Sequence, residues 1–184
     1  MSADGFVSGP NGVNDWILRS SDETSRAWVV AHSFDASLII MGRKSFESMA
    51  PYWPTAAGPF AVPMNETPKG VFTQKGYNGL APANAEQTPA AASWAQARIF
   101  DGDLAEEIEK LKAGEGKPIL AIGGAGFMRS LIATGLIDEY HLAIHPVVLG
   151  EGLQIFNGIT QPRDLKLVEA KSFPGGIVAH TYSV

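Results

Sequence analysis

The sequence "SLIIMGRKSFESM" occupies residues 37–49 and passes from an apolar run to a glycine, two cations and a hydroxyl. Residues 38–41 form a short apolar run with β-branched side chains, which is typical of a buried strand. Gly42 permits a tight turn after that strand, and the residues that follow indicate a helix. The stretch therefore predicts a strand–turn–helix unit of an α/β sheet. Three polar residues stand at the exit of its strand: Arg43, Lys44 and Ser45.

A second glycine turn follows another apolar run in "ILAIGGAGF", residues 119–127. Ligands of α/β sheets gather at the carboxyl ends of the strands, where helix N-termini direct N–H groups toward phosphate. Gly123 and Gly124 would let a pyrophosphate approach the backbone, and residues 43–45 offer charge and a hydroxyl to a further phosphate. The alternative is that the glycines only make tight turns, although two such turns in one sheet weaken that explanation.

The second turn does not have the G-x-G-x-x-G pattern of a Rossmann dinucleotide site, because Arg129 stands where the third glycine is needed. The first strand exit is also not followed by an acidic residue placed to hold a ribose. Any nucleotide site built from these turns is therefore of another type.

Strands and helices alternate along the rest of the chain, which predicts a mostly parallel α/β sheet covered on both faces, with antiparallel strands at the C-terminal end. Asp103 and Glu106 form a capping-box pattern, Glu106 is spaced to pair with Lys110, and Gly135 is a helix stop. Residues 76–97, rich in Ala, Pro, Gly and Asn, predict a long surface loop. Strands are expected at 37–41, 70–73, 97–100, 118–122 and 139–149 (interrupted at Pro146), with a hairpin over 164–173 and 177–184, and helices at 22–33, 103–113 and 125–134.

The composition predicts one globular domain over residues 1–184, because the chain is 45% hydrophobic and 18% charged. A net charge of −5 argues against a general binder of nucleic acid or anionic membranes, and the absence of cysteine excludes thiol nucleophiles and Cys–zinc sites. No apolar run approaches the ~20 residues of a membrane helix, and no signal peptide pattern opens the chain, which fits a cytoplasmic location. His141 and His145 lie on a predicted strand about 13 Å apart, so no metal site is expected. A serine hydrolase has no support, because no G-x-S-x-G motif is present.

Four segments carry a family resemblance: "SADGFVSGPNG" (2–12), "MGRKSFESM" (41–49), "PKGVFTQKG" (68–76) and the long block at 119–156. They resemble the dihydrofolate reductase-like superfamily, and most fully the RibD C-terminal domain family of riboflavin-biosynthesis reductases and its stand-alone members. The resemblance implies a three-layer α/β/α fold with a mostly parallel mixed sheet and a C-terminal antiparallel hairpin. It also implies NADPH binding without a Rossmann domain, and a homodimer.

The resemblance implies cofactor-binding roles for several short segments. The family segment around the 2′-phosphate of the adenosine and the neighbouring phosphates corresponds to Gly42, Arg43, Lys44 and Ser45. The family's strand end beside the adenosine corresponds to Thr73, Gln74 and Lys75. Its pyrophosphate-binding turn corresponds to Ile122, Gly123, Gly124, Ala125, Gly126 and Phe127. The opening loop beside the nicotinamide matches Val7 and Trp16. Independently, three cations near the predicted site favour the extra phosphate of NADP over NAD: Arg43, Lys44 and Lys75.

The chain departs from the folate-reducing members of this superfamily at two positions. Arg26 stands where those members have an acid, with Asp22 and Glu23 the nearest acids, and Ala143 stands where they have a threonine. Dihydrofolate is therefore not the expected substrate, unless it is bound differently. The start also differs, because Met1 stands where a first hydrophobic strand should finish. Either the natural chain begins upstream or the fold has one strand fewer, and we favour the first.

The sequence thus predicts an NADPH-dependent reductase that transfers a hydride to a small pteridine-, pyrimidine- or carbonyl-type substrate. Asp4 is the candidate catalytic proton donor, although it equally suits a turn before Gly5. Candidate substrate-binding residues are Asn14, Asp15, Trp16 and Arg26. One alternative is the riboflavin-pathway reduction of an aminopyrimidine ribosyl phosphate, with Arg19 or Arg26 at a second phosphate. Another is a non-catalytic nucleotide-binding module.

Overall fold

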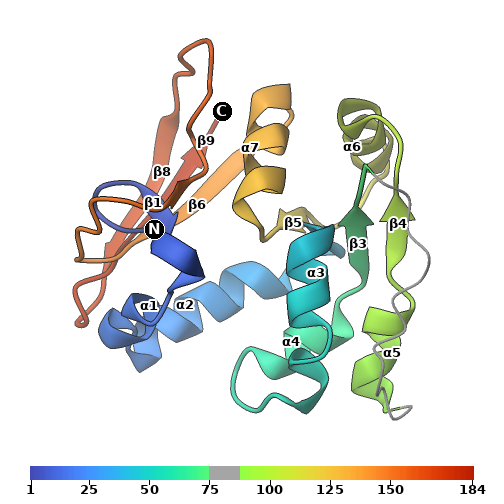
Figure 1. Cartoon of the computed structure of the whole chain (residues 1–184), viewed down its shortest axis with the longest axis horizontal. Coiled ribbons are helices and arrows are strands. Elements are labelled where there is room, and N and C mark those ends of the chain that lie inside the picture. The colour runs from blue at the N-terminus through green and yellow to red at the C-terminus, as the bar shows by residue number, and fades with distance from the viewer. Residues whose placement is uncertain (75–87) are drawn as a thin grey trace. The chain divides into compact units, whose positions relative to one another are not determined.

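The computed structural model describes residues 1–74 and 88–184 (Figure 1). The contacts within the chain divide it into two compact units. We call Val29–Ser130 the central unit, and Met1–Trp28 together with Leu131–Val184 the terminal unit. The expectation of a single domain over residues 1–184 stays a prediction. In the described part of the chain, no helix is long and apolar enough to span a membrane.

The central unit is built on a parallel sheet of four strands in the order β4-β3-β2-β5. These strands are β2 (Leu38–Gly42), β3 (Lys69–Phe72), β4 (Arg98–Phe100) and β5 (Ile119–Ala121). Each lies within one residue of a strand end expected from the sequence, so the mostly parallel α/β architecture is confirmed. Strands β2 and β3 are buried along most of their length, which fits the apolar run of β2, whereas β3 begins with a buried lysine, Lys69.

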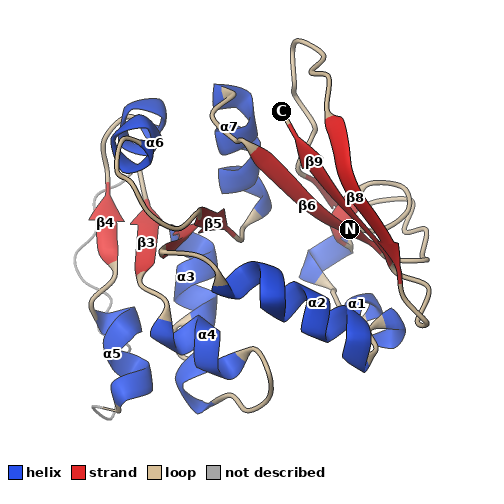
Figure 2. Cartoon of the chain, turned by 180° about the vertical axis from the view of Figure 1, so that it is seen from behind, coloured by secondary structure: helices blue, strands red, loops and turns tan. Residues whose placement is uncertain are grey.

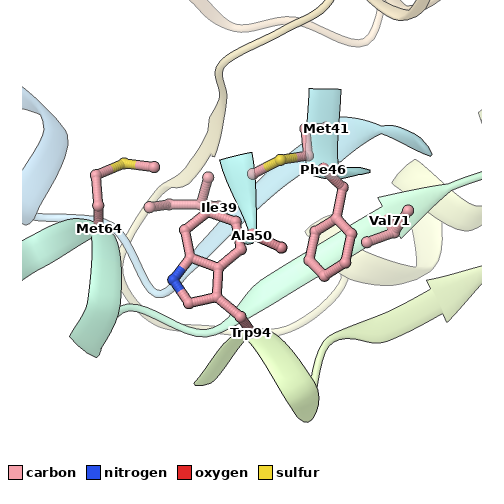
Figure 3. Packing of buried hydrophobic residues seen from close by; sticks show 7 residues of the cluster. All are labelled: Ile39, Met41, Phe46, Ala50, Met64, Val71 and Trp94. Atoms are coloured by element: carbon pink, nitrogen blue, oxygen red, sulfur yellow. The ribbon is translucent and has the colours of Figure 1, made fainter. Parts of the chain in front are cut away.

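Helices α3 (Arg43–Met49), α4 (Ala61–Glu66) and α5 (Pro89–Ala95) supply side chains to one core with β2 and β3. A short 3-10 turn, η2 (Trp53–Thr55), precedes α4. Figure 3 shows the indole of Trp94, from α5, lying among Ile39, Ala50 and Met64. Trp94, Phe46 and Ile39 are almost completely buried, so this core holds α3 and α5 to the sheet.

The expectation of a loop over residues 76–97 is wrong for its second half, which contains α5. Thr88 caps this helix by accepting a hydrogen bond from the Ala91 N–H, and Pro89 occupies the first turn. Trp94 then buries its whole side chain, which stabilises a segment that composition alone made look irregular. Residues 75–87 lie outside the described part of the chain.

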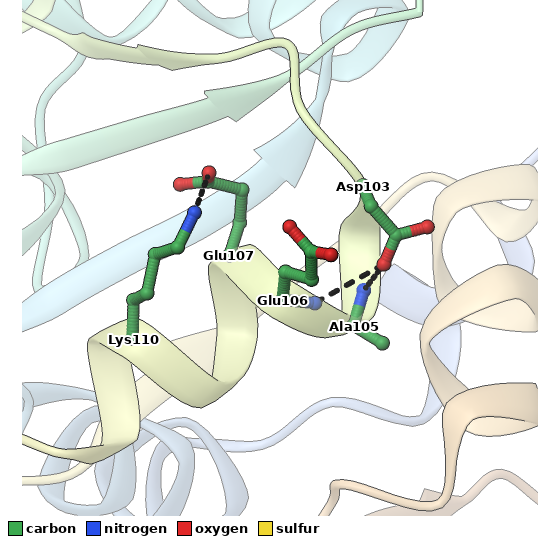
Figure 4. A network of polar contacts seen from close by, with 5 residues as sticks. All are labelled: Asp103, Ala105, Glu106, Glu107 and Lys110. Carbon is green, nitrogen blue, oxygen red and sulfur yellow. Dashed lines mark hydrogen bonds and ion pairs between the residues drawn. The ribbon is translucent and has the colours of Figure 1, made fainter.

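Helix α6 (Leu104–Lys112) begins at the cap that the sequence predicted. The Asp103 carboxylate accepts hydrogen bonds from the N–H groups of Ala105 and Glu106, at 3.0 and 3.1 Å (Figure 4). The expected ion pair is wrong in one partner, because Lys110 binds Glu107 at 2.9 Å rather than Glu106. Residues three apart are neighbours on a helix as residues four apart are, so either spacing permits a pair.

The terminal unit contains an antiparallel sheet in the order β6-β9-β8 (Figure 2). Its strands are β6 (Glu139–Ile144), β8 (Lys166–Ser172) and β9 (Val178–Ser183), which confirms the C-terminal hairpin. The expected strand over 139–149 ends at Ile144, two residues before Pro146, which has no N–H to donate to a ladder. A smaller sheet pairs β1 (Phe6–Ser8) with β7 (Leu153–Gln154).

Four further helical segments lie in or next to the terminal unit. The 3-10 turn η1 (Pro10–Gly12) and helix α1 (Trp16–Ser20) belong to the terminal unit. Helices α2 (Glu23–Phe34) and α7 (Ala125–Thr134) each run across the boundary between the units. Helix α7 has the bounds expected from the sequence, and Gly135 follows it with φ of 78°, which glycine adopts most readily.

The cap of α6 gives a first testable prediction. Replacing Asp103 by Ala removes the acceptor of two N–H groups, so the variant should lose about 1 kcal/mol of unfolding free energy in urea denaturation. The matched control is Asp101→Ala, because Asp101 is an exposed acid just outside the helix. An equal loss in both variants would show that the cap does not contribute.

Candidate functional site

The candidate site lies at the carboxyl-terminal edge of the parallel sheet, where β2 and β5 end. The N–H of Gly42 donates to the carbonyl oxygen of Gly123 at 3.0 Å, and the Ile122 N–H donates to Ile40 at 3.2 Å. The two glycine turns are therefore hydrogen-bonded neighbours. Thr73 follows β3 at the same edge, and its N–H donates to Phe100 at 3.0 Å.

Two glycines of the site are required by close packing. A Cβ on Gly42 would lie 2.9 Å from the Cβ of Phe127, and a Cβ on Gly124 would lie 2.7 Å from the hydroxyl oxygen of Ser45. Gly123 has φ of 138°, and the peptide bond between Gly123 and Gly124 is cis. Gly123 and Gly124 are half-buried, with the Ser45 side chain packed against Gly124.

A stack of aromatic side chains joins the second turn to β3 and β4. The ring of Phe127 stacks on Phe72 with centroids 5.2 Å apart, and Phe72 stacks on Phe100 at 4.8 Å. Phe127 is in the first turn of α7, so this stack helps to set where that helix begins. Gly126 has open space around its Cα, which leaves room beside the turn.

Two cations accompany the turns at the start of α3. Arg43 makes a loose ion pair with Glu47, at 3.7 Å, and its side chain stays 39% exposed. Lys44 is exposed, and Ser45 is half-buried beside Gly124. Gln74 is exposed after the buried Thr73, whereas the predicted cation Lys75 lies outside the described residues.

These groups fit the phosphates of a dinucleotide. The first turn of α7 has backbone N–H groups that no helical carbonyl can satisfy. The Ser45 hydroxyl adds a further donor, and Arg43 with Lys44 adds positive charge. The Ser45 hydroxyl fills the place of a Cβ on Gly124, whereas a Cβ on Gly126 would meet no neighbouring side chain within 4 Å, so the approach open to an anion lies beside Gly126.

Asp4 is used to close a turn in the terminal unit. Its carboxylate accepts hydrogen bonds from the N–H groups of Leu149, at 3.1 Å, and Gly150, at 2.7 Å. The hydroxyl of Ser2 and these amides hold the pKa of Asp4 below its ordinary value. A carboxylate ionised in this way carries no proton to donate at neutral pH, so the geometry matches the turn role rather than the catalytic role.

The predicted substrate residues lie on or beside α1 and α2. Trp16 is buried and donates its indole N–H to the Val13 carbonyl at 3.2 Å. Asn14 and Asp15 are exposed, and Asp15 pairs with Arg19 at 3.1 Å. Arg26 is exposed on α2, and Val7 is half-buried in β1. Of these residues, Trp16 is the one that is buried and held by a hydrogen bond.

A part-buried polar pair beside Trp16 has no signal in the sequence. The Ser20 hydroxyl lies 2.8 Å from Nδ1 of His145, and the rings of His145 and Trp16 meet edge-on with centroids 5.2 Å apart. Burial lowers the pKa of His145 to about 4, so the imidazole is neutral at neutral pH. No sequence signal joins Ser20 to His145, because 125 positions separate them.

Asp22 is an acid close in sequence to Arg26, the position at which folate-reducing relatives have an acid. Its carboxylate binds other groups. It accepts hydrogen bonds from the Thr24 hydroxyl at 2.6 Å and the Ser25 N–H at 2.8 Å, which cap α2. Its second oxygen accepts the Gly175 N–H of the hairpin turn at 2.7 Å. These bonds lower the pKa of Asp22 to about 2. The carboxylate is thus committed to holding α2 and the hairpin.

Comparison with known proteins agrees with this architecture. The chain is 33% identical to YyaP of Bacillus subtilis over 99% of its own length and 90% of that protein. A Shewanella sp. PV-4 protein assigned to riboflavin biosynthesis has the same fold, with a TM-score of 0.73 and 19% identity, over 100% of this chain and 94% of that one.

A longer protein of Thermotoga maritima, named as a bifunctional aminopyrimidine deaminase and uracil reductase, also matches. The TM-score is 0.63 at 17% identity, over 99% of this chain and 54% of that one. The family model described as the RibD C-terminal domain matches residues 1–179. On this match and the likeness to YyaP, the chain belongs to the RibD C-terminal domain family.

Proposed function

We propose that the protein is an NADPH-dependent reductase that transfers a hydride to a small pteridine-, pyrimidine- or carbonyl-type substrate. The observation that carries the proposal is the hydrogen-bonded pair of glycine turns, with Ser45 packed against Gly124. Membership of the RibD C-terminal domain family supports a reductase, as does the reductase activity named for the Thermotoga relative.

The residues at the carboxyl edge would hold the phosphate groups of the cofactor. The backbone of residues 123–127 and the Ser45 hydroxyl would bind the pyrophosphate, and Arg43 with Lys44 would bind the 2′-phosphate. The bound nicotinamide supplies the hydride, while the protein binds, orients and excludes water. The two described cations favour NADPH over NADH.

The substrate is expected to differ from dihydrofolate. Arg26 and Ala143 replace the acid and the hydroxyl of folate-reducing relatives, and Asp22 is bound to backbone N–H groups. The second candidate function is the riboflavin-pathway reduction of an aminopyrimidine ribosyl phosphate, which the name of the Thermotoga relative favours. If the protein binds NADPH tightly but reduces none of a panel of these substrates, it is a non-catalytic nucleotide-binding module.

We also propose a homodimer that forms through β8. This strand pairs with β9 alone among the described strands, and all seven of its residues are exposed. Leu167 and Val168 are 53% and 59% exposed. An unpaired edge strand with exposed apolar side chains is a template for pairing with another chain, and a second copy offers the same edge.

The cofactor proposal predicts a selective effect of Arg43→Ala. Loss of the guanidinium should weaken NADPH binding about tenfold to a hundredfold, because a hydrogen bond to a charged group contributes about 1.5–3 kcal/mol. NADH, which has no 2′-phosphate, should change by less than about twofold. Fluorescence titration with both nucleotides gives the two affinities.

The control for this titration is Lys117→Ala, an exposed cation before β5 at the opposite edge of the sheet. It should leave both affinities unchanged. Equal losses for NADPH and NADH in Arg43→Ala would return Arg43 to a structural role, and absence of NADPH binding by the unaltered protein would overturn the proposed function.

The glycine packing predicts an effect on stability that can be rescued. Gly124→Ala places a Cβ against the Ser45 hydroxyl oxygen, so it should cost about 1–3 kcal/mol of unfolding free energy. Adding Ser45→Ala removes the contacted atom and should restore part of the loss. Gly126→Ala is the matched control, since its Cβ would meet open space, and it should be neutral or slightly stabilising.

The dimer proposal is tested by light scattering over a range of protein concentrations. The double variant Leu167→Lys/Val168→Lys should be a monomer where the unaltered protein is a dimer, because charges at the paired edge oppose association. Leu18→Lys is the control, since Leu18 is 75% exposed on α1. A monomer for the unaltered protein at every concentration would contradict the proposal.

A further inference from the structure

The central unit contains a cavity of about 700 Å3 at the amino-terminal edge of its parallel sheet. Its walls come from α4, α5 and the first residues of β3 and β4, including Lys69 and Arg98. The glycine turns follow the opposite ends of β2 and β5 in the same sheet. The cavity is therefore separate from the candidate cofactor site.

A buried lysine lies in the wall of this cavity. The Lys69 residue is 1% exposed, and its ammonium donates to the Thr67 carbonyl oxygen and to the Ser93 hydroxyl oxygen, the latter at 2.9 Å. The ammonium also lies 4.6 Å from the ring centroid of Trp94. When Lys69 is protonated, its ammonium only donates, so the oxygen of Ser93 accepts and the Ser93 hydrogen is left for another acceptor. Ser93 lines the cavity, so a hydroxyl donor backed by a buried cation is available there.

Asn65 supplies a second fixed donor to the same cavity. Its side-chain oxygen accepts the Trp94 indole N–H at 2.8 Å, and its nitrogen donates to the Trp53 carbonyl oxygen at 2.9 Å. These bonds fix which end of the amide is the nitrogen, and they use one of its two N–H groups. The second N–H remains for the cavity that Asn65 lines.

The remaining wall is small, apolar and close to neutral. Ala61, Ala90 and Ala92 leave room for a hydrocarbon body. Glu66 on α4 and Arg98 on β4 are exposed and opposite in charge, and α5 has no ionisable residue between Pro89 and Ala95. Among the described residues that line the cavity, Glu66 and Arg98 offset each other in charge, and Lys69 is the remaining ionisable group.

We propose that this cavity binds a small monocarboxylate with a flat apolar body. The Ser93 hydroxyl and the Asn65 amide hold the carboxylate, the Lys69 ammonium stands behind Ser93, and the alanine wall contacts the body. One negative charge matches the one uncompensated positive charge, whereas a neutral ligand would leave the buried ammonium without a counter-charge.

Binding should depend on pH through Lys69. Burial lowers the pKa of Lys69 to about 7, so its ammonium form is complete only below that pH. A bound carboxylate favours the ammonium, so binding takes up a proton above neutral pH. Affinity should then fall by up to about tenfold for each pH unit above about 7.

Benzoate is a suitable probe, with benzamide as the uncharged probe of matched shape. Calorimetric titration of the full chain should show benzoate binding at about pH 6, weaker binding at about pH 9, and little binding of benzamide. Ser93→Ala should weaken benzoate binding about tenfold or more, because it removes a hydrogen bond to a charged group. Ser130→Ala, on α7, is the matched serine control.

Two further variants test separately the charge of Lys69 and the volume of the cavity. Lys69→Met should abolish the pH dependence together with most of the affinity, and Ala92→Leu should block binding without changing any charge. If Lys69→Met does not fold, the Ser93 and Ala92 variants still decide the question. Equal binding of benzamide, an unchanged Ser93→Ala affinity, or a pH-independent affinity would overturn the proposal, as would no benzoate binding.

Discussion

The hydrogen bond between the Gly42 N–H and the Gly123 carbonyl oxygen is the contact on which the candidate site depends. It extends the pairing of β2 with β5 beyond the ends of the strands, so that both glycine turns meet at one edge. Phe127 then packs where a Cβ on Gly42 would lie, and Ser45 packs where a Cβ on Gly124 would lie. Because the phosphate groups would be bound largely by main chain, the site requires this register more than it requires any one side chain.

Three aspartates of the chain hold the backbone in place. Asp4, Asp22 and Asp103 each accept at least two backbone N–H groups. The lowered pKa of Asp22, about 2 against an ordinary 3.8, means that its contribution to stability is present above about pH 4 and is lost as pH falls toward about 2. Carboxylates that are ionised at neutral pH do not supply protons, so the proton of the proposed reduction comes from water or from another side chain.

Local patterns were sufficient for the elements whose ends are marked in the sequence. Strand β2 ends at a glycine, α6 begins at Asp103, and α7 lies between Gly124 and Gly135, so their bounds were predicted closely. Helix α5 was missed because its stability comes from Trp94, whose neighbours Phe46 and Asn65 are remote in sequence. The Ser20–His145 pair was missed for the same reason. Both glycine turns were recognised, but the contact between Ser45 and Gly124 required the structure.

The cations at the two edges of the parallel sheet differ in how far they are exposed to water. At the carboxyl edge, Arg43 stays partly exposed to water. At the amino edge, Lys69 is buried, and its pKa falls from 10.5 to about 7. The unfolded chain therefore binds a proton in that pH range that the folded chain does not. The contribution of Lys69 thus makes folding stability fall as pH decreases from about 10.5 to about 7, and that contribution is constant below about pH 7. A carboxylate that binds beside Lys69 would offset this cost, whereas no such cost exists at Arg43. At the proposed amino-edge site, ligand binding would therefore be coupled to proton uptake by Lys69.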